Sequence, residues 1–371
     1  MNQTTTRTTR GARLPSEKRV LADERTGATI WQLTAAPCIN HAPYFLNPAW
    51  AGAQRDLLVI ASHRTGGPDL FGIRLPDGAL LQLTGGGDVS PWSACVSPDG
   101  RRVYFTAGRS GGQLRVLDVD TLEETVLAEL PPSSWLGNCS ISPDGAEIAL
   151  AVSRGAVNAL VAFRTDTGIA RTLHETPALI AHAQWSPDGR RVLFASDLPR
   201  MWLVEADGTN ARPLRPQTRR EWLVHEAWLT NDEIIFTHWP RALKAIRPDG
   251  SGERTIAAFN CWHPAPRRDG TLIVCDTALP DVGLQLVDPA SGARRTLCHP
   301  RASSKGSQWS QPEPIWEGPV PEAAYGPQWT HPHPSFTPDG HGVVYTSDVS
   351  GHPQVYLAHV AHLPDSWTPS A

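Results

Sequence analysis

Ser97-Pro98-Asp99-Gly100-Arg101-Arg102-Val103-Tyr104-Phe105 is the stretch that decides the fold. Proline presets φ at one corner of a tight turn and glycine accepts a positive φ, so Pro-Asp-Gly predicts a turn. The β-branched and aromatic residues that follow it favour a strand. The same turn recurs three times, at Ser142-Pro143-Asp144-Gly145, Ser186-Pro187-Asp188-Gly189 and Thr337-Pro338-Asp339-Gly340.

Weaker copies of this turn and strand fill the intervals, with strands expected at 56–60, 233–236 and 271–274. A second pair of strands follows most copies, as at 114–119 and 283–288. The spacing is about 45 residues over the first five copies, which is typical of a repeat protein. Four short antiparallel strands in each of seven units predict an all-β fold, a seven-bladed β-propeller.

The repeat also predicts the domain organisation. The length of 371 residues would by itself favour two domains, but one propeller accounts for it better. We expect a single domain over residues 20–363 and an insertion at roughly 301–327. The segment 1–19 and the tail 364–371 are expected to be either flexible or strapped to the outside. Residues 29–34 resemble the fourth strand of other units, so we expect them to complete the last blade and close the ring.

The composition excludes several classes of function. A net charge of −4 argues against electrostatic binding to nucleic acid or to an anionic membrane. The polar N-terminus lacks the apolar core of a signal peptide, and no apolar run approaches the ~18 residues that span a bilayer, so we expect a cytoplasmic protein. The six cysteines show no CxxC spacing, which favours reduced, buried thiols over a disulfide or zinc framework.

Histidines gather at one position of the repeat. His331 and His333 stand two residues apart, which on an extended segment directs both side chains to one face, and Gln328 can add an oxygen. The first strand of each blade lines the channel of a propeller. Four further units place a histidine there: His263, His225, His182 and His41. Imidazole and amide ligands suit Mn, Zn, Fe or Ni, and the spacing does not choose between them.

Several of these segments carry a resemblance. Gln328-x-x-His331-x-His333-Pro334-Ser335-Phe336, Tyr345-Thr346-Ser347-Asp348, His225-Glu226-x-Trp228 and Arg200-Met201-Trp202-Leu203 resemble the oligogalacturonate lyase family, a seven-bladed propeller related to TolB-like and WD40-like propeller repeats. The resemblance implies a metal-dependent polysaccharide lyase of pectin degradation that cleaves an acidic oligosaccharide by β-elimination.

The same resemblance implies roles for individual residues. A divalent metal, Mn²⁺ in the family, would be held by Gln328, His263, His331 and His333. His225 would be the general base, and Arg200 would pair with the substrate carboxylate. His41, Tyr44 and His182 are expected to line the channel and contact the substrate, although a structural role fits His41 and Tyr44 equally well.

Each of these residues also has a structural alternative. His331 and His333 could cap backbone carbonyls of an edge strand, His263 could be a hydrogen-bonded core residue, and His225 could form a surface pair with Glu226. Arg200 could form a salt bridge at a blade edge. Two other functions therefore stay open: a non-catalytic propeller that serves as an interaction platform, and a metal-dependent hydrolase or isomerase with the same ligands.

The chain also departs from the family pattern. The segment before Arg200 is shortened to 194–199, Pro327 replaces an arginine before Gln328, and residues 182–185 lack an expected basic side chain. These departures lie in the expected saccharide-binding wall and leave the metal ligands intact. We therefore expect the metal site to be retained, whereas the substrate is open to a related acidic sugar or another carboxylate with an acidic neighbouring carbon.

Overall fold

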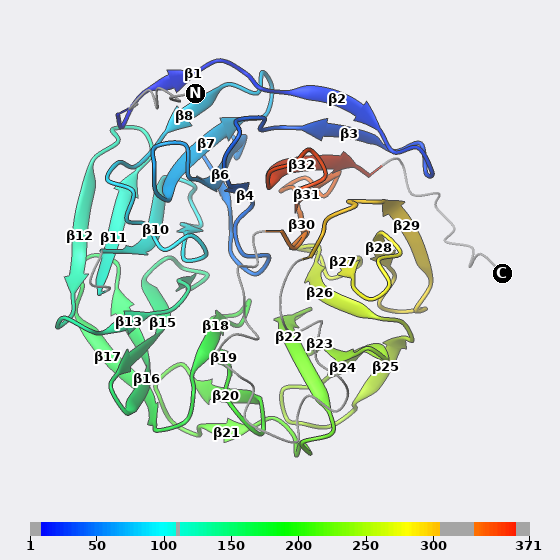
Figure 1. Cartoon of the computed structure of the whole chain (residues 1–371). Coiled ribbons are helices and arrows are strands. Elements are labelled where there is room, and N and C mark those ends of the chain that lie inside the picture. Colours follow the sequence, from blue (N-terminus) through cyan, green and yellow to red (C-terminus); the bar gives the residue numbers. More distant parts are fainter. Residues whose placement is uncertain (1–8, 109–111, 305–329, 361–371) are drawn as a thin grey trace. The chain divides into compact units, whose positions relative to one another are not determined.

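The computed structural model describes residues 9–108, 112–304 and 330–360. Every regular element in these ranges is a β-strand, and they form seven antiparallel sheets (Figure 1). This confirms the predicted fold class, an all-β seven-bladed β-propeller, and we refer to the sheets as blades one to seven in the order of their inner strands. The described part of the chain contains no helix that is long and apolar enough to cross a membrane.

The chain divides into two compact units. Unit 1 comprises Met1–Glu17 and Leu46–Leu214, and unit 2 comprises Lys18–Phe45 and Arg215–Ala371. Each unit takes one segment from the N-terminal part of the chain. The division differs from the single domain expected over 20–363, and that expectation stays a prediction.

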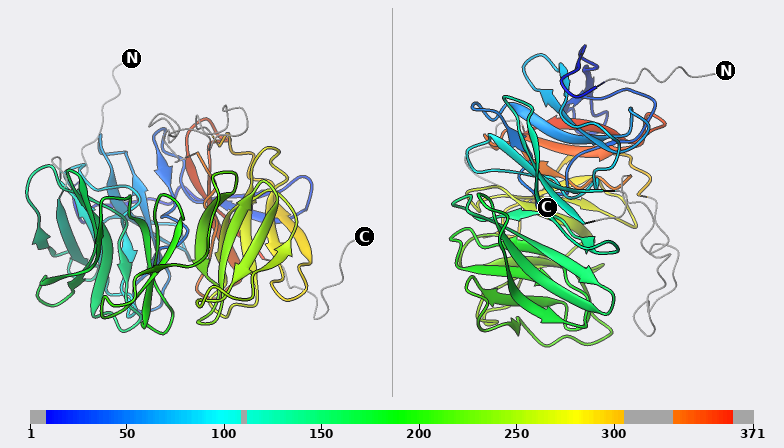
Figure 2. Two further views of the ribbon diagram at one scale, coloured as in Figure 1. Left: turned by 90° about the horizontal axis from the view of Figure 1, so that it is seen from below. Right: turned by 90° about the vertical axis from the view of Figure 1, so that its left-hand side faces the viewer.

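Unit 1 contains blades one to four, in each of which neighbouring strands are joined by short connections (Figure 2). Blade one contains β5 (Trp50–Ala51), β6 (Leu57–Ser62), β7 (Asp69–Arg74) and β8 (Leu80–Gln82). Blade two contains β9 (Cys95–Val96), β10 (Arg102–Ala107), β11 (Gln113–Asp118) and β12 (Glu124–Glu129). Blade three contains β13 (Trp135–Leu136), β14 (Ser140–Ile141), β15 (Glu147–Arg154), β16 (Val157–Arg164) and β17 (Ala170–Thr176). Blade four contains β18 (Ala181–Trp185), β19 (Arg191–Ala195), β20 (Met201–Glu205) and β21 (Arg212–Pro213).

Unit 2 contains blades five to seven, and the inner strands of these blades carry most of the histidines of interest. Blade five contains β22 (Trp222–Trp228), β23 (Ile234–Trp239), β24 (Ala242–Ile246) and β25 (Arg254–Ala257). Blade six contains β26 (Cys261–Pro266), β27 (Ile273–Thr277), β28 (Leu284–Val287) and β29 (Arg294–Cys298). Blade seven contains β30 (Ser335–Phe336), β31 (Gly342–Ser347), β32 (Gln354–His359), β3 (Thr29–Gln32) and β2 (Arg19–Ala22), and unit 2 also includes β4 (Asn40–His41).

The Pro-Asp-Gly turns form as predicted, between the inner strand and the next strand of a blade. In the turn Ser97–Gly100, Gly100 has a φ of 79° and its N–H donates to the Ser97 carbonyl at 2.9 Å. The Ser97 hydroxyl donates to Asp99 Oδ1 at 2.5 Å and accepts from the Arg102 N–H at 2.9 Å. The first residue of the motif therefore closes the hairpin with its side chain, which explains why Ser or Thr begins each full copy.

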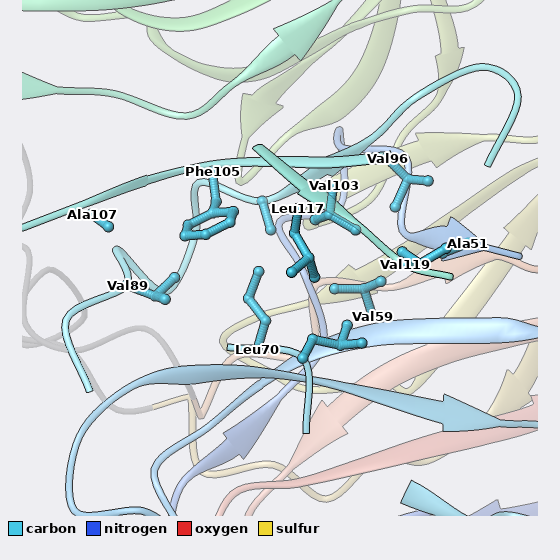
Figure 3. Packing of buried hydrophobic residues seen from close by; sticks show 12 residues of the cluster. Ala51, Val59, Leu70, Val89, Val96, Val103, Phe105, Ala107, Leu117 and Val119 are labelled. Atoms are coloured by element: carbon cyan, nitrogen blue, oxygen red, sulfur yellow. The ribbon is translucent and has the colours of Figure 1, made fainter. Parts of the chain in front are cut away.

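The hydrophobic core of unit 1 lies between neighbouring blades. Figure 3 shows one such cluster, in which Val59 and Leu70 of blade one face Phe105 and Leu117 of blade two. All four side chains are buried. Burial of a side chain of this size contributes roughly 1.5–3 kcal/mol, so each contact between blades is held mainly by apolar packing.

Part of the N-terminal segment, which was expected to be either flexible or strapped to the outside, is attached to the edge of blade one. β1 (Arg13–Leu14) pairs with β8, and the Gly11 N–H donates to the Gln82 carbonyl at 2.9 Å. The outer edge of blade one offers unpaired backbone groups, and the segment satisfies them. Residues 1–8 and the expected tail 364–371 lie outside the described residues, as does the expected insertion from 305 onward.

β3 completes blade seven, as its sequence predicted. It pairs with β32 in antiparallel register, Ile30 opposite Ala358 and Gln32 opposite Tyr356. β2 then adds a fifth strand outside β3. The strand from the N-terminal part of the chain thus takes the fourth place in the last sheet. Closure of the whole ring by this pairing stays a prediction.

Candidate active site

Three histidines of unit 2 converge on a small volume. His263 belongs to β26, and His331 and His333 precede β30. One ring nitrogen of each lies within 4.8 Å of those of the others, and all three side chains are fully buried. The ring centroids of His263 and His333 are 4.1 Å apart. Three imidazoles at this spacing fit a divalent transition metal. The expected fourth ligand, Gln328, lies outside the described residues.

A β-bulge sets the direction of His263. In the ladder between β26 and β27, Cys261 pairs with Thr277 and Pro264 pairs with Cys275. Trp262 and His263 therefore face Asp276 alone. A bulge of this kind re-aims a side chain that regular pairing would place elsewhere.

Asp276 orients the His263 ring. The His263 N–H donates to Asp276 Oδ1 at 2.7 Å, and His263 Nδ1 lies 2.8 Å from Oδ2. If Nδ1 carries the hydrogen, Nε2 presents its lone pair, which is the arrangement of carboxylate, histidine and metal found in many metal sites. Burial raises the pKa of Asp276 to about 7, against hydrogen bonds that lower it. A cation bound beside His263 would favour the charged carboxylate.

His331 and His333 meet His263 by a different route from the one expected. The sequence predicted an extended segment with both rings on one face, and this was wrong: His331 lies in a bend and His333 has a φ of 45°. Pro332 and Pro334 leave few backbone donors there. The Pro332 carbonyl accepts from the Thr346 N–H at 2.9 Å, which attaches the segment to β31.

The surroundings of His333 keep its ring neutral. Burial, and after it the nearby His263, His331 and His41, hold the pKa of His333 well below its ordinary value. A neutral imidazole is the form that binds a metal, so burial favours metal binding over protonation here.

Phe45 is a site residue that sequence reasoning missed. Its ring is stacked on His333 at 6.1 Å between centroids and lies 5.3 Å from His263 and 6.0 Å from His225. Tyr44, which was expected, contacts His333 at 5.5 Å. Both aromatic side chains are buried. An isolated phenylalanine usually predicts a core residue, so the sequence offered little reason to select Phe45. The one signal was its position directly after Tyr44.

His225 lies beside the cluster in a second bulge. Val224 pairs with Thr237 and Ala227 with Ile235, so His225 and Glu226 face one residue of β23, and His225 has a φ of 56°. Its half-buried ring is 4.2 Å from that of His263. Nδ1 lies 2.6 Å from the Trp262 carbonyl oxygen, which can only accept. Nδ1 therefore carries the hydrogen and Nε2 is the basic nitrogen.

The bulges correct one assumption of the sequence analysis. His182, His225 and His333 each have a positive φ, and His182 and His225 are the first residues of their bulges. His263 is the second residue of its bulge, so it does not hold the same place as His225. The count of residues along the repeat could not reveal this difference, since a bulge adds a residue without changing the hydrophobic pattern.

His41 is the last residue of β4 and is fully buried. Its Nδ1 lies 2.8 Å from the Ala42 carbonyl oxygen, and the Ala42 N–H donates to Thr346 Oγ1 at 3.0 Å. His41 is thus attached to the strand that also holds the His331–His333 segment. Its ring also contributes to the lowered pKa of His333.

Arg200 and His182 belong to the other compact unit. Arg200 stands between β19 and β20, after the cis peptide bond Leu198–Pro199, and its carbonyl accepts from the Ser196 N–H at 2.7 Å. Its side chain is half-buried. His182 lies in the bulge of β18, also half-buried. Their expected roles toward the substrate stay predictions.

Comparison with known proteins supports the resemblance noted in the sequence. A family model described as oligogalacturonate lyase matches residues 196–366. The oligogalacturonide lyase of Pectobacterium atrosepticum is 27% identical over 96% of this chain and 99% of that protein. The oligogalacturonate lyase of Dickeya dadantii is 26% identical over the same shares of the two chains.

Two solved structures share the fold. An oligogalacturonate lyase in complex with manganese matches with a TM-score of 0.83 and 23% identity, over 96% of this chain and 99% of that one. An oligogalacturonate lyase from Vibrio parahaemolyticus matches with a TM-score of 0.81 and 22% identity, over 97% and 100% of the two chains. The propeller fold is therefore shared along nearly the whole length of each.

Proposed function

Because the chain resembles the oligogalacturonate lyases over nearly its whole length, we propose that it is a metal-dependent lyase that cleaves oligogalacturonate by β-elimination. The observation that carries the proposal is the position of His225, whose ring lies 4.2 Å from that of His263 in the buried cluster and whose Nδ1 is already used by the Trp262 carbonyl. A base next to a divalent-metal site is what abstraction of a proton alpha to a carboxylate requires.

The reaction begins with the proton on C5 of a uronate. Nε2 of His225 takes this proton, and the electron pair of the C5–H bond forms the C4–C5 double bond. The bond from C4 to the glycosidic oxygen breaks, and the departing sugar receives a proton. The products are a shortened oligosaccharide and a sugar with an unsaturated uronate end. Because the bond breaks by elimination, no water is consumed.

The proton on C5 is only weakly acidic, so the neighbouring carboxylate must be neutralised. When bound, a divalent cation, Mn²⁺ by the resemblance, supplies positive charge that stabilises the enediolate. His263, His331 and His333 would hold it, with Gln328 as the fourth ligand. Arg200 is proposed as a second partner of the carboxylate, since a guanidinium binds a carboxylate through two parallel hydrogen bonds.

An ultraviolet assay tests the proposal. The protein is loaded with Mn²⁺ and mixed with digalacturonate and with other oligouronates, because the shortened wall before Arg200 leaves the preferred uronate open. We expect a rise in absorbance from the conjugated product, which a chelator abolishes. Hydrolysis would release sugars without this absorbance and would identify a hydrolase.

A pair of variants assigns the activity to the cluster. His331→Ala should lose both the bound metal and the absorbance change. His352→Ala changes an exposed histidine of unit 2 and should retain both. The absence of stoichiometric metal in the wild-type protein, purified without chelator, would instead support a non-catalytic propeller.

A further inference from the structure

One backbone oxygen connects the proposed base with two blades. The Trp262 carbonyl, in β26 of blade six, accepts from His225 Nδ1 at 2.6 Å and from the Thr237 hydroxyl at 3.1 Å. Both donors belong to blade five. A carbonyl oxygen has two lone pairs, and these two hydrogen bonds use both of them.

The bulge in β26 explains why this oxygen points toward the neighbouring blade. Trp262 and His263 together face Asp276 of β27. The His263 N–H donates to the side chain of Asp276 instead of to a main-chain carbonyl of that strand. The main-chain groups of the bulge are thus taken out of the regular ladder, and the Trp262 carbonyl bonds to side chains of blade five.

Thr237 is placed to hold that oxygen still. It lies in β23 directly opposite Val224, the residue before His225, and its side chain is fully buried. Its hydroxyl also lies 3.6 Å from Cys261 Sγ, a longer and weaker contact than the bond to the carbonyl. A hydroxyl has a single hydrogen, and the shorter bond to the Trp262 carbonyl uses it.

We propose that Thr237 is a positioning residue for His225. By fixing the Trp262 carbonyl it fixes the acceptor of the Nδ1–H, and so keeps Nε2 as the nitrogen that faces the substrate. The role of Nε2 as the base rests on the proposed lyase function, whereas the hold on the ring does not. The rate of proton transfer falls steeply when a base is misplaced, because the base must approach the proton closely and in line.

Thr237→Val tests this proposal, with Thr237→Ser as the matched control. Valine keeps the shape of threonine and removes the hydroxyl, whereas serine keeps the hydroxyl. We expect Thr237→Val to lower kcat by about tenfold with little change in KM, as for an interaction that acts in the transition state. With substrate deuterated at C5, the isotope effect on kcat should increase. Thr237→Ser should behave as the wild type, and bound metal should stay stoichiometric in both.

Nitrogen NMR of histidine-labelled protein gives an independent measurement. The protein is loaded with Zn²⁺, which is diamagnetic, and the His225 signals are assigned from their loss in His225→Gln. We expect His225 to show a protonated Nδ1 in the wild type and in Thr237→Ser, and a mixture of tautomers in Thr237→Val.

The two measurements separate the two proposals. If the wild type lacks lyase activity but Thr237→Val changes the tautomer of His225, the lyase proposal fails and the positioning role stands. If Thr237→Val folds and leaves kcat, the isotope effect and the tautomer unchanged, the positioning role is wrong. A lower melting temperature alone would show only a structural hydroxyl and would also overturn it.

Discussion

Asp276 accepts two hydrogen bonds from a single residue, His263: one from its main-chain N–H at 2.7 Å and one at Nδ1, which lies 2.8 Å from the carboxylate. The carboxylate thereby fixes both the backbone of the bulge and the rotation of the ring. Asp276 is almost fully buried, so it has little water to replace these partners. The orientation of the proposed ligand His263 therefore depends directly on Asp276.

Asp276→Asn should therefore weaken metal binding without removing a ligand. We expect the affinity for Mn²⁺ to fall by about 10- to 100-fold, as for other changes to groups that orient a metal ligand. Calorimetric titration of the metal-free protein measures this directly. Asp269→Asn, in the turn between β26 and β27, is the control and should bind metal like the wild type. Equal affinities for all three proteins would show that Asp276 does not orient a ligand.

His225→Ala separates the base from the metal site. Removal of a general base typically lowers kcat by about 10²–10⁴-fold, and we expect a loss in this range. Bound metal, measured by elemental analysis, should stay stoichiometric, because His225 is not among the proposed ligands. Activity on digalacturonate that survives the change intact would eliminate His225 as the base.

Phe45 is buried against the rings of His225, His263 and His333, so its size should matter to stability. Phe45→Ala removes most of a buried ring and should cost about 3–5 kcal/mol of unfolding free energy, whereas Phe45→Leu should cost less because it leaves a smaller cavity. Urea unfolding of the metal-free proteins measures both. Identical losses for the two variants would mean that the ring is not packed as described.

Alanine substitutions at two glycines with positive φ test how closely the Pro-Asp-Gly turn is packed. Gly100 and Gly155 both have a positive φ, so alanine at either position pays the cost of the left-handed region, about 1–2 kcal/mol. A Cβ at Gly100 would also lie 2.7 Å from the Gly52 carbonyl oxygen, whereas a Cβ at Gly155 meets nothing within 4 Å. Gly100→Ala should therefore destabilise the protein more than Gly155→Ala in urea unfolding. The reverse order would contradict the close approach of Gly52.

The lowered pKa of Asp23 predicts that the protein loses stability in acid. Burial acts to raise its pKa, but hydrogen bonds from the N–H groups of His299 and Arg25 and from Thr26 lower it to about 2. Because the folded pKa lies below the unfolded value of about 3.8, this carboxylate stabilises the fold above pH ~4 and the stabilisation disappears as pH falls toward 2. The contribution is about 2 kcal/mol at neutral pH.

Asp23→Asn measures this contribution, because it removes the titrating group. The stability difference between the wild type and the variant should be constant above about pH 5 and should shrink as the pH is lowered further. Asp232→Asn, which changes an exposed aspartate of unit 2, is the control for a general effect of charge. A difference that stays constant down to pH 2 would contradict the shifted pKa of Asp23.

The sequence allowed the fold to be predicted because its signals are local. A turn such as Ser97–Gly100 is specified by its own residues, and the strand that follows by its β-branched and aromatic side chains. The pairing of β3 with β32 was also accessible, since residues 29–34 repeat the pattern of a fourth strand. For residues 13–14 the sequence left a flexible and an attached segment both open, because nothing local shows that a short segment covers a sheet edge.

Three residues of the expected metal site could be named from the sequence, but their geometry could not. His263, His331 and His333 were named from their place in the repeat, and the structure brings them together. The bulges at Trp262 and His225 were not predicted, since they depend on tertiary pairing across two strands. Asp276 was missed for the same reason: a lone aspartate in an apolar strand becomes a partner of His263 only through the bulge opposite it.

The composition of blade seven has a consequence for how the protein is made. Its strands β2 and β3 leave the ribosome long before β30, β31 and β32, because blades one to six and the segment after them lie between the two parts in sequence. The early strands must therefore wait for the synthesis of the later blades before β3 meets its partner β32, and the apolar side chains of Val20 and Leu21 in β2 are exposed even in the folded protein. Pairing across so long a sequence separation is slow, which makes docking of this segment the natural last step of folding. His331 and His333 belong to the same late part of the sequence, so the three clustered histidines can meet only after this part has been synthesised.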